Sequence, residues 1–313
     1  MMKRFLFAII ALSLISCVEQ LSTTAQSSSD EVIVNEVKCT KGEFSPDGKF
    51  IGFTGEKYKG LFVKDLSTNE IVKITDADGA GWRFSWSPDS RGITFRETEY
   101  LEKSATYKIM KRFLNKESNE LVGEFENTVW PPLWKDTIYS VDTVRSSNIA
   151  LAVKPLSILK NPAKPLKFNA FTSDNRVSLI DLKTGILKNL EEGTHSPSIS
   201  DDGRFVLFIH LDTIKVLDTV KNTTIEIGRG SSPSWVSGSK KVVYTSTLDD
   251  GKNITFSQIF LFDMISRVSE TIAVPAERMP LAPAISSDGS KLLYTDYITG
   301  ISSLKNSEMR SRR

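Results

Sequence analysis

A short motif that recurs along the chain is the feature that most constrains the fold. In "EFSPDGKFIGFTG" (residues 43–55), Asp47 and Gly48 stand between two apolar runs, which is typical of a hairpin turn. Five further segments resemble it, and each has a bulky residue before the turn. These anchor residues are Phe44, Trp86, Trp134, Ile199, Trp235 and Ile285. Their spacing, 36 to 65 residues, averages about one four-stranded propeller blade.

The units predict an all-β fold, a six-bladed β-propeller of four-stranded blades. In the first unit, apolar alternation and turn residues indicate strands over 42–45, 50–54, 60–66 and 70–75. The last unit is too short for four strands. The alternating segment "EVIVNEV" (31–37) is therefore predicted to supply its outer strand, which closes the ring and protects the sheet edges.

The repeated pattern resembles the WD40-like repeats of TolB-type propellers. Its first half has the form Pro-x-Trp-Ser-Pro-Asp-Gly, and its second half, Asp-Leu-x-Thr-Gly, is matched closely at 181–185 and 65–69. The resemblance covers roughly residues 32 to 310. It departs in the third unit, at Lys135-Asp136, and in the fifth, at Ser237-Gly238. TolB-like proteins bind other envelope proteins, so the resemblance implies a non-enzymatic binding or scaffold module.

Recurrence also decides how the conspicuous side chains are interpreted. A Trp at the same place in several units indicates packing between neighbouring sheets rather than ligand stacking. An Asp that recurs at the same turn position in four units indicates a turn-forming role rather than acid catalysis. The residues so assigned are Asp47, Asp89, Asp202 and Asp288.

The N-terminus has the pattern of a secretory leader. A basic start at Lys3 and Arg4 precedes an apolar run over 5–15, too short to span a bilayer. The run ends in "LISC", which resembles the bacterial lipobox and implies cleavage after Ser16 and a lipid on Cys17. The alternative is an ordinary signal peptide. Residues 1–16 are thus predicted as a lipoprotein signal peptide, 17–31 as a flexible polar tether and 32–313 as the propeller.

The net charge and the two cysteines restrict the kinds of partner that the protein is expected to bind. The formal net charge of +2 comes from Lys3 and Arg4, so the cleaved chain is neutral and lacks the basic footprint of a general nucleic-acid binder. The membrane is instead predicted to be reached through the lipid on Cys17, in the bacterial envelope, periplasmic or surface-exposed. Cys39 lies in an alternating run and is predicted to be a half-buried strand residue.

Few residues suggest catalysis or metal binding. His195 precedes an inner strand and is a candidate ligand contact at the channel mouth, whereas His210 lies within a strand and is predicted to be structural. Asp76 and Asp78 precede a glycine but lack the later ligands of a calcium loop, so a plain loop is preferred. The sequence has no Gly-x-Ser-x-Gly elbow. No catalytic residue, metal or cofactor is therefore predicted.

The longest gap between anchors holds a basic segment, 144–173, predicted as an insertion. It has no acidic residue before Ser173 and five basic ones: Arg145, Lys154, Lys160, Lys164 and Lys167. Long insertions in compact repeats are often functional, so contact with an acidic partner or lipid headgroups is one hypothesis. The other is a loop folded over the propeller wall. For the whole protein, the alternatives to a binding module are a glycan- or peptide-processing hydrolase or lyase with its site at the channel mouth, and a small-ligand sensor.

Overall fold

The computed structural model describes residues 31–32, 39, 41–102, 104–125, 129–135, 138–142 and 166–306. These residues form β-strands and a short 3-10 helix, η1 (Glu56–Tyr58), which confirms the all-β fold class. Within these ranges, no helix is both long and apolar enough to cross a membrane. The predicted signal peptide and Cys17 lie outside the described residues, as does the predicted tether apart from Glu31.

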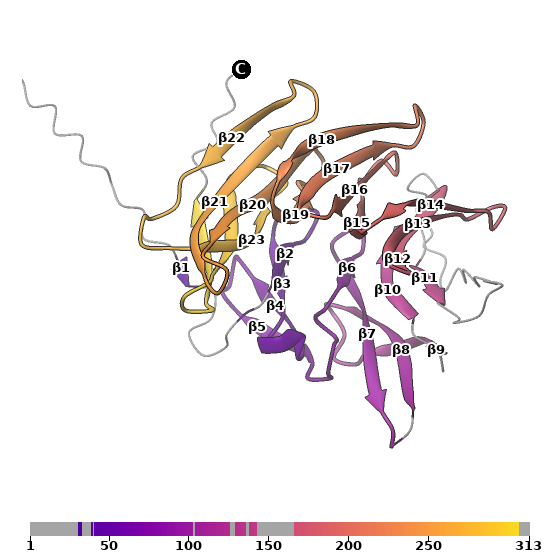
Figure 1. Ribbon diagram of the computed structural model, residues 1–313. Helices are drawn as coiled ribbons and strands as arrows, with labels where there is room; N and C mark the ends of the chain where they lie inside the picture. Colours follow the sequence, from indigo (N-terminus) through magenta and orange to yellow (C-terminus); the bar gives the residue numbers. More distant parts are fainter. Residues whose placement is uncertain are drawn as a thin grey trace, which may run out of the picture.

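The sheets form the blades of a six-bladed β-propeller, with their first strands toward the centre (Figure 1). The first unit comprises β2 (Gly42–Phe44), β3 (Phe50–Phe53), β4 (Leu61–Asp65) and β5 (Ile71–Thr75). The second comprises β6 (Phe84–Trp86), β7 (Gly92–Tyr100), β8 (Ala105–Phe113) and β9 (Glu120–Phe125). The fourth comprises β15 (Thr194–Ile199), β16 (Phe205–His210), β17 (Thr213–Asp218) and β18 (Thr223–Arg229). The fifth comprises β19 (Ser231–Trp235), β20 (Lys241–Asp249), β21 (Ile254–Asp263) and β22 (Val268–Ile272).

The last unit is closed by the N-terminal strand, as predicted. Its sheet has the order β1 (Glu31–Val32), β25 (Ser302–Asn306), β24 (Lys291–Asp296) and β23 (Pro280–Ile285). Glu31 pairs with Leu304 and Val32 with Ser303. The backbone N–H of Cys39 then donates to the carbonyl of Gly300 at 3.0 Å, a second contact that holds the N-terminal segment against the last unit.

The third unit is less regular than the others. It contains a two-stranded sheet, β10 (Val129–Trp134) with β11 (Ile138–Asp142), and a three-stranded one, β12 (Phe168–Ser173), β13 (Arg176–Asp181) and β14 (Leu187–Glu192). The strands described in this unit therefore fall into two sheets. The end of the predicted insertion 144–173 is among the described residues and forms the strand β12. Asp174 and Asn175, both with positive φ, turn it back onto β13.

The turns after the inner strands show why Asp recurs there. Asp47 Oδ1 accepts hydrogen bonds from Ser45 Oγ at 2.7 Å and from the Lys49 N–H at 3.1 Å. Ser45 Oγ in turn accepts the Phe50 N–H at 3.0 Å. The same arrangement occurs at Ser87–Asp89, Ser200–Asp202 and Ser286–Asp288. These bonds confirm a turn-forming role, and those from Ser286 and Ser290 lower the pKa of Asp288 to about 2.

The anchor residues pack between sheets, as predicted for the core. Trp86 and Trp134 are buried, while Trp235 is half-buried and its indole N–H donates to the Ser198 carbonyl of the preceding unit at 3.2 Å. Cys39 is buried in the same way rather than half-buried as predicted, beside Ile51 and Leu293. The core therefore consists of clusters between successive blades, which fixes where each inter-blade surface lies.

Candidate functional site

The end of the ring at which the inner strands begin is called the channel mouth. Arg83, just before β6, donates from Nη1 to the Pro197 carbonyl on β15 at 2.7 Å. These residues belong to the second and fourth units, so the guanidinium reaches across the centre of the ring. Burial there lowers the pKa of Arg83, and the opposite effect of the nearby Glu43 is smaller. The contact therefore joins two non-adjacent units across the ring.

A second charged contact lies at the start of the first unit. Lys41 Nζ is 2.6 Å from Glu43 Oε1, and both side chains are about one-third exposed. Lys41 and Arg83 each lie three residues before the anchor residue of their unit. At the same position the fourth and fifth units have Ser196 and Ser232. Charge at the inner strands is therefore contributed by the first two units, which gives the channel mouth a polar side.

His195, the candidate ligand contact, lies at the start of β15 at the channel mouth, and among the described residues it has no acidic partner. It is exposed on β15, and its Nδ1 is 3.0 Å from Ser196 Oγ. His210, predicted to be structural, ends β16 with Nδ1 3.1 Å from Glu191 Oε1 and 3.0 Å from Lys215 Nζ. The described residues contain no group of three or more His, Cys, Asp or Glu side chains that could hold a metal ion.

Of the predicted basic segment, the described part of the chain contains only Lys167. Its side chain is exposed, and it immediately precedes β12. Arg145, Lys154, Lys160 and Lys164 lie outside the described residues. Leu166, next to Lys167, is buried against the fourth unit, so the end of this segment is part of the packed propeller.

Two long hairpins extend beyond their own blades at the channel mouth. Because neighbouring strands are antiparallel, the turn between second and third strands lies at the end where inner strands begin. In the fifth unit, β19 pairs with β20 only as far as Thr245, and β22 pairs with β21 only from Ile259. Residues 246–258 thus form a two-stranded tip flanked by neither neighbour. Figure 1 shows the corresponding projection of β7 and β8 in the second unit.

Both hairpin tips expose large apolar side chains. Leu248 and Phe256 pair across β20 and β21 and are 63% and 49% exposed. On the other tip, Tyr100 and Leu101 are 72% and 54% exposed. Apolar side chains grouped on projecting elements are typical of protein-interaction surfaces. These residues are called the hairpin tips below.

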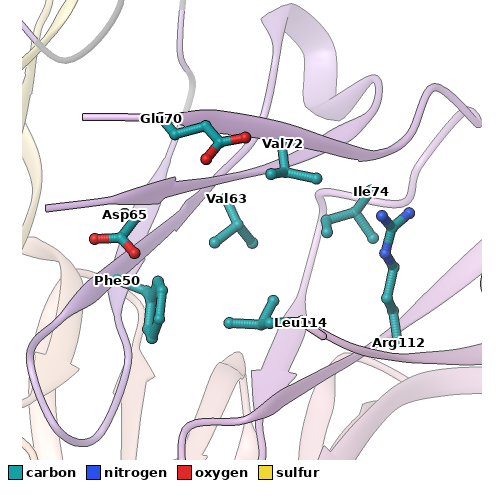
Figure 2. A pocket seen from close by; sticks show the side chains of 8 residues that line it. All are labelled: Phe50, Val63, Asp65, Glu70, Val72, Ile74, Arg112 and Leu114. Atoms are coloured by element: carbon teal, nitrogen blue, oxygen red, sulfur yellow. The ribbon is translucent and has the colours of Figure 1, made fainter. Parts of the chain in front are cut away.

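A groove between the first and second units lies at the opposite end of the ring, beside the turn that joins β4 to β5. It encloses a cavity of about 150 Å³. Figure 2 shows its lining, which comprises Phe50, Val63, Asp65, Glu70, Val72, Ile74, Arg112 and Leu114. The apolar side chains form the middle of the groove, with carboxylates toward one side and Arg112 toward the other.

The prediction from sequence did not include the hairpin tips or the groove. The hairpins had a readable signal, because "GITFRETEY" and "KVVYTSTLD" are longer than the other second strands. The groove had none, because it combines ordinary strand residues of two units. Neither surface contains a residue type that would mark it as a site.

Comparisons with known proteins show the fold. No family model and no curated protein matches the sequence. A chain of the mitotic checkpoint complex is 14% identical with a TM-score of 0.56, over 97% of this chain and 98% of that one. The β-propeller domain of Cps50 (Swd1) from Myceliophteria thermophila is 13% identical with a TM-score of 0.56, over 87% and 98%. TolB from Acinetobacter baumannii is 15% identical with a TM-score of 0.46, over 86% of this chain and 54% of that one.

Proposed function

We propose that the protein is a non-enzymatic, lipid-anchored propeller of the bacterial cell envelope that binds other envelope proteins. The observation that carries the proposal is the pair of hairpin tips, whose apolar side chains project beside the channel mouth. The channel mouth beside the hairpin tips offers the exposed His195 as a further polar contact, while Lys41 and Arg83 are held by contacts within the ring. The basic residues Arg145, Lys154, Lys160, Lys164 and Lys167 are proposed to contact an acidic partner or lipid headgroups.

The proposal predicts that the hairpin tips are required for partner capture. We expect the double variant Leu248→Ser, Phe256→Ser to lower crosslinked capture of envelope proteins about tenfold, because buried apolar anchors contribute most of the binding energy at interfaces. The measurement is in-cell crosslinking followed by purification of the full chain. Unchanged capture would contradict the role given to this surface.

A matched control uses apolar residues that are even more exposed, at the other end of the ring. Val220 and Ile265 lie in the turns after β17 and β21 and are 73% and 78% exposed. The variant Val220→Ser, Ile265→Ser removes similar apolar surface away from the channel mouth. It is expected to leave capture at the level of the unaltered protein. An equal loss in both variants would mean that capture follows general surface hydrophobicity.

The proposed anchor predicts that a labelled fatty acid is incorporated through Cys17. Incorporation is expected to be lost in Cys17→Ala and retained in Cys39→Ala. Cys39 should not substitute for Cys17, because it is buried and burial raises the pKa of its thiol to about 11. Label that persists in Cys17→Ala would remove the lipid from the proposal and leave an ordinary signal peptide as the explanation of the leader.

A further inference from the structure

The groove between the first and second units has the shape and lining of a small apolar pocket. Val63 on β4 and Val72 on β5 pair across the strands, and Ile74 follows two residues later on the same face. Phe50 lies alongside, with its ring 6.3 Å from that of Trp86. Leu114, just after β8, contributes the opposing apolar wall (Figure 2).

The two sides of this pocket carry opposite charge. Glu70 is exposed beside Asp65, whose pKa is lowered mainly by the hydrogen bond from Ser67 Oγ and which is therefore ionised at neutral pH. Toward the other side lies Arg112, whose Nε donates to the Lys116 carbonyl at 3.1 Å. Across the described ranges, no ion pair joins Glu70 or Arg112 to another side chain. Both charges are thus available to a ligand.

We propose that this groove docks a peptide segment of a partner protein through one apolar side chain flanked by a basic residue on one side and an acidic residue on the other. The apolar side chain fills the cavity, the basic residue faces Glu70 and Asp65, and the acidic residue faces Arg112. The inference rests on the proposed binding function and names the chemistry of the partner. The groove is distinct from the hairpin tips, because it lies at the other end of the ring.

The size of the cavity limits the apolar group. A cavity of about 150 Å³ lined by aliphatic and aromatic side chains holds a benzene-sized molecule. A side chain up to the size of Phe therefore fits into the cavity. The outer side of the groove remains open at Val72, which is 38% exposed, so a side chain can enter without unfolding of the strands.

Binding of capped synthetic peptides to the full chain tests the pocket directly. The peptide Arg-Gly-Phe-Gly-Glu is expected to bind about tenfold more tightly than Arg-Gly-Ser-Gly-Glu, because only the first places a ring in the cavity. Val72→Phe fills the pocket and is expected to lower affinity for the Phe peptide about tenfold. Val268→Phe, at an exposed valine of the outer strand β22, is the control and leaves affinity unchanged. No binding to the unaltered chain, or equal effects of the two variants, would overturn the proposal.

The charge preference is tested by reversal at Arg112. The unaltered protein is expected to prefer the Arg-and-Glu peptide to Arg-Gly-Phe-Gly-Arg about threefold, as expected for exposed ion pairs. Arg112→Glu is expected to invert that preference, while thermal melting confirms that the fold is retained. A preference unchanged by the reversal would show that the groove does not select charge and would overturn this part of the proposal.

Site-specific crosslinking separates this inference from the proposed function. A photoreactive phenylalanine analogue is placed at Asn115, which is exposed next to Leu114 at the edge of the groove, or at Phe256 on a hairpin tip, and partner adducts are measured in cells. Adducts from both positions are expected. Adducts from Phe256 alone would overturn docking in the groove and leave the binding function standing. Adducts from neither position would overturn both.

Discussion

Replacing Trp134 by Ala is expected to lower the free energy of unfolding by about 3–5 kcal/mol, the usual loss for a large buried aromatic residue. Trp134 is almost completely buried, and its ring meets that of Phe113 edge-on at a centroid distance of 5.7 Å. Its six-membered ring also packs on Gly92, where a Cβ would come within 2.8 Å of Cη2. Few neighbours can move into the resulting cavity, because they belong to strands of two sheets.

Denaturant unfolding of conservative variants separates packing from hydrogen bonding. Among the residues that the structure describes, the buried indole N–H of Trp134 has no hydrogen-bond acceptor. Trp134→Phe should therefore cost much less than Trp134→Ala, because it removes a polar atom that makes no bond. Trp235→Phe, by contrast, removes the hydrogen bond to the Ser198 carbonyl. It should lower the free energy of unfolding by about 1 kcal/mol for that bond, in addition to the effect of the lost buried apolar area. If Trp134→Phe lowered the free energy of unfolding as much as Trp134→Ala, packing of the aromatic ring would not explain the contribution of Trp134 to stability.

Asp218→Ala is expected to lower the free energy of unfolding by about 2–3 kcal/mol. Asp218 is only 5% exposed and receives two bonds from Arg204, from Nε at 3.1 Å and Nη2 at 2.6 Å. It also accepts the backbone N–H groups of Val220 and Lys221. Removing the carboxylate leaves these donors unsatisfied. The Arg204 side chain is partly exposed to water, so the loss of unfolding free energy is expected to be smaller than for a fully buried ion pair.

The same pair makes stability depend on acid pH. The hydrogen bonds from Arg204 hold the pKa of Asp218 well below its usual range. A carboxyl whose folded-state pKa is depressed stabilises the fold above its unfolded pKa of about 3.9, and the stabilisation is lost as pH falls below that value. The urea midpoint of the unaltered protein should therefore fall more steeply below pH ~4 than that of Asp218→Ala.

Asp263 provides a matched control for this prediction. It occupies the same turn position in the fifth unit and accepts the N–H groups of Ile265 and Ser266, but its nearest cation, Lys241, is 3.8 Å away. Asp263→Ala should thus cost only about 1 kcal/mol, for the turn bonds. Equal losses in the two variants would show that the Arg204 pair contributes nothing beyond the turn.

The regular part of the fold could be predicted because its signals are local. Turn residues such as Asp47 and alternating strands recur in each unit, and the short last unit indicated that residues near Glu31 complete it. The third unit lacked these signals. In β12, the buried Asn169 pairs with Ile180 at the place where β3 has Ile51 paired with Lys64, so the apolar pattern of a second strand is interrupted.

The candidate site could be predicted only in part, because its contacts join distant residues. His195 was placed at the channel mouth from its position before an anchor, but the brace from Arg83 to Pro197 spans 114 positions and has no motif. The groove depends on Arg112 and Leu114 lying opposite Val72, which follows from the packing of two blades. Periodicity identifies a strand face, but it does not show where two faces leave a space between them.

The pairing of β1 with β25 has a consequence for biosynthesis. Residues near Glu31 emerge long before their partners near Leu304. During that interval the first strand has no sheet to join, and the ring cannot be completed until the residues near Leu304 are available. Such a non-local pairing slows the final step and leaves unpaired strand edges exposed to other chains. A factor that shields the nascent chain would therefore act on the N-terminal segment for longer than on any other part of the ring.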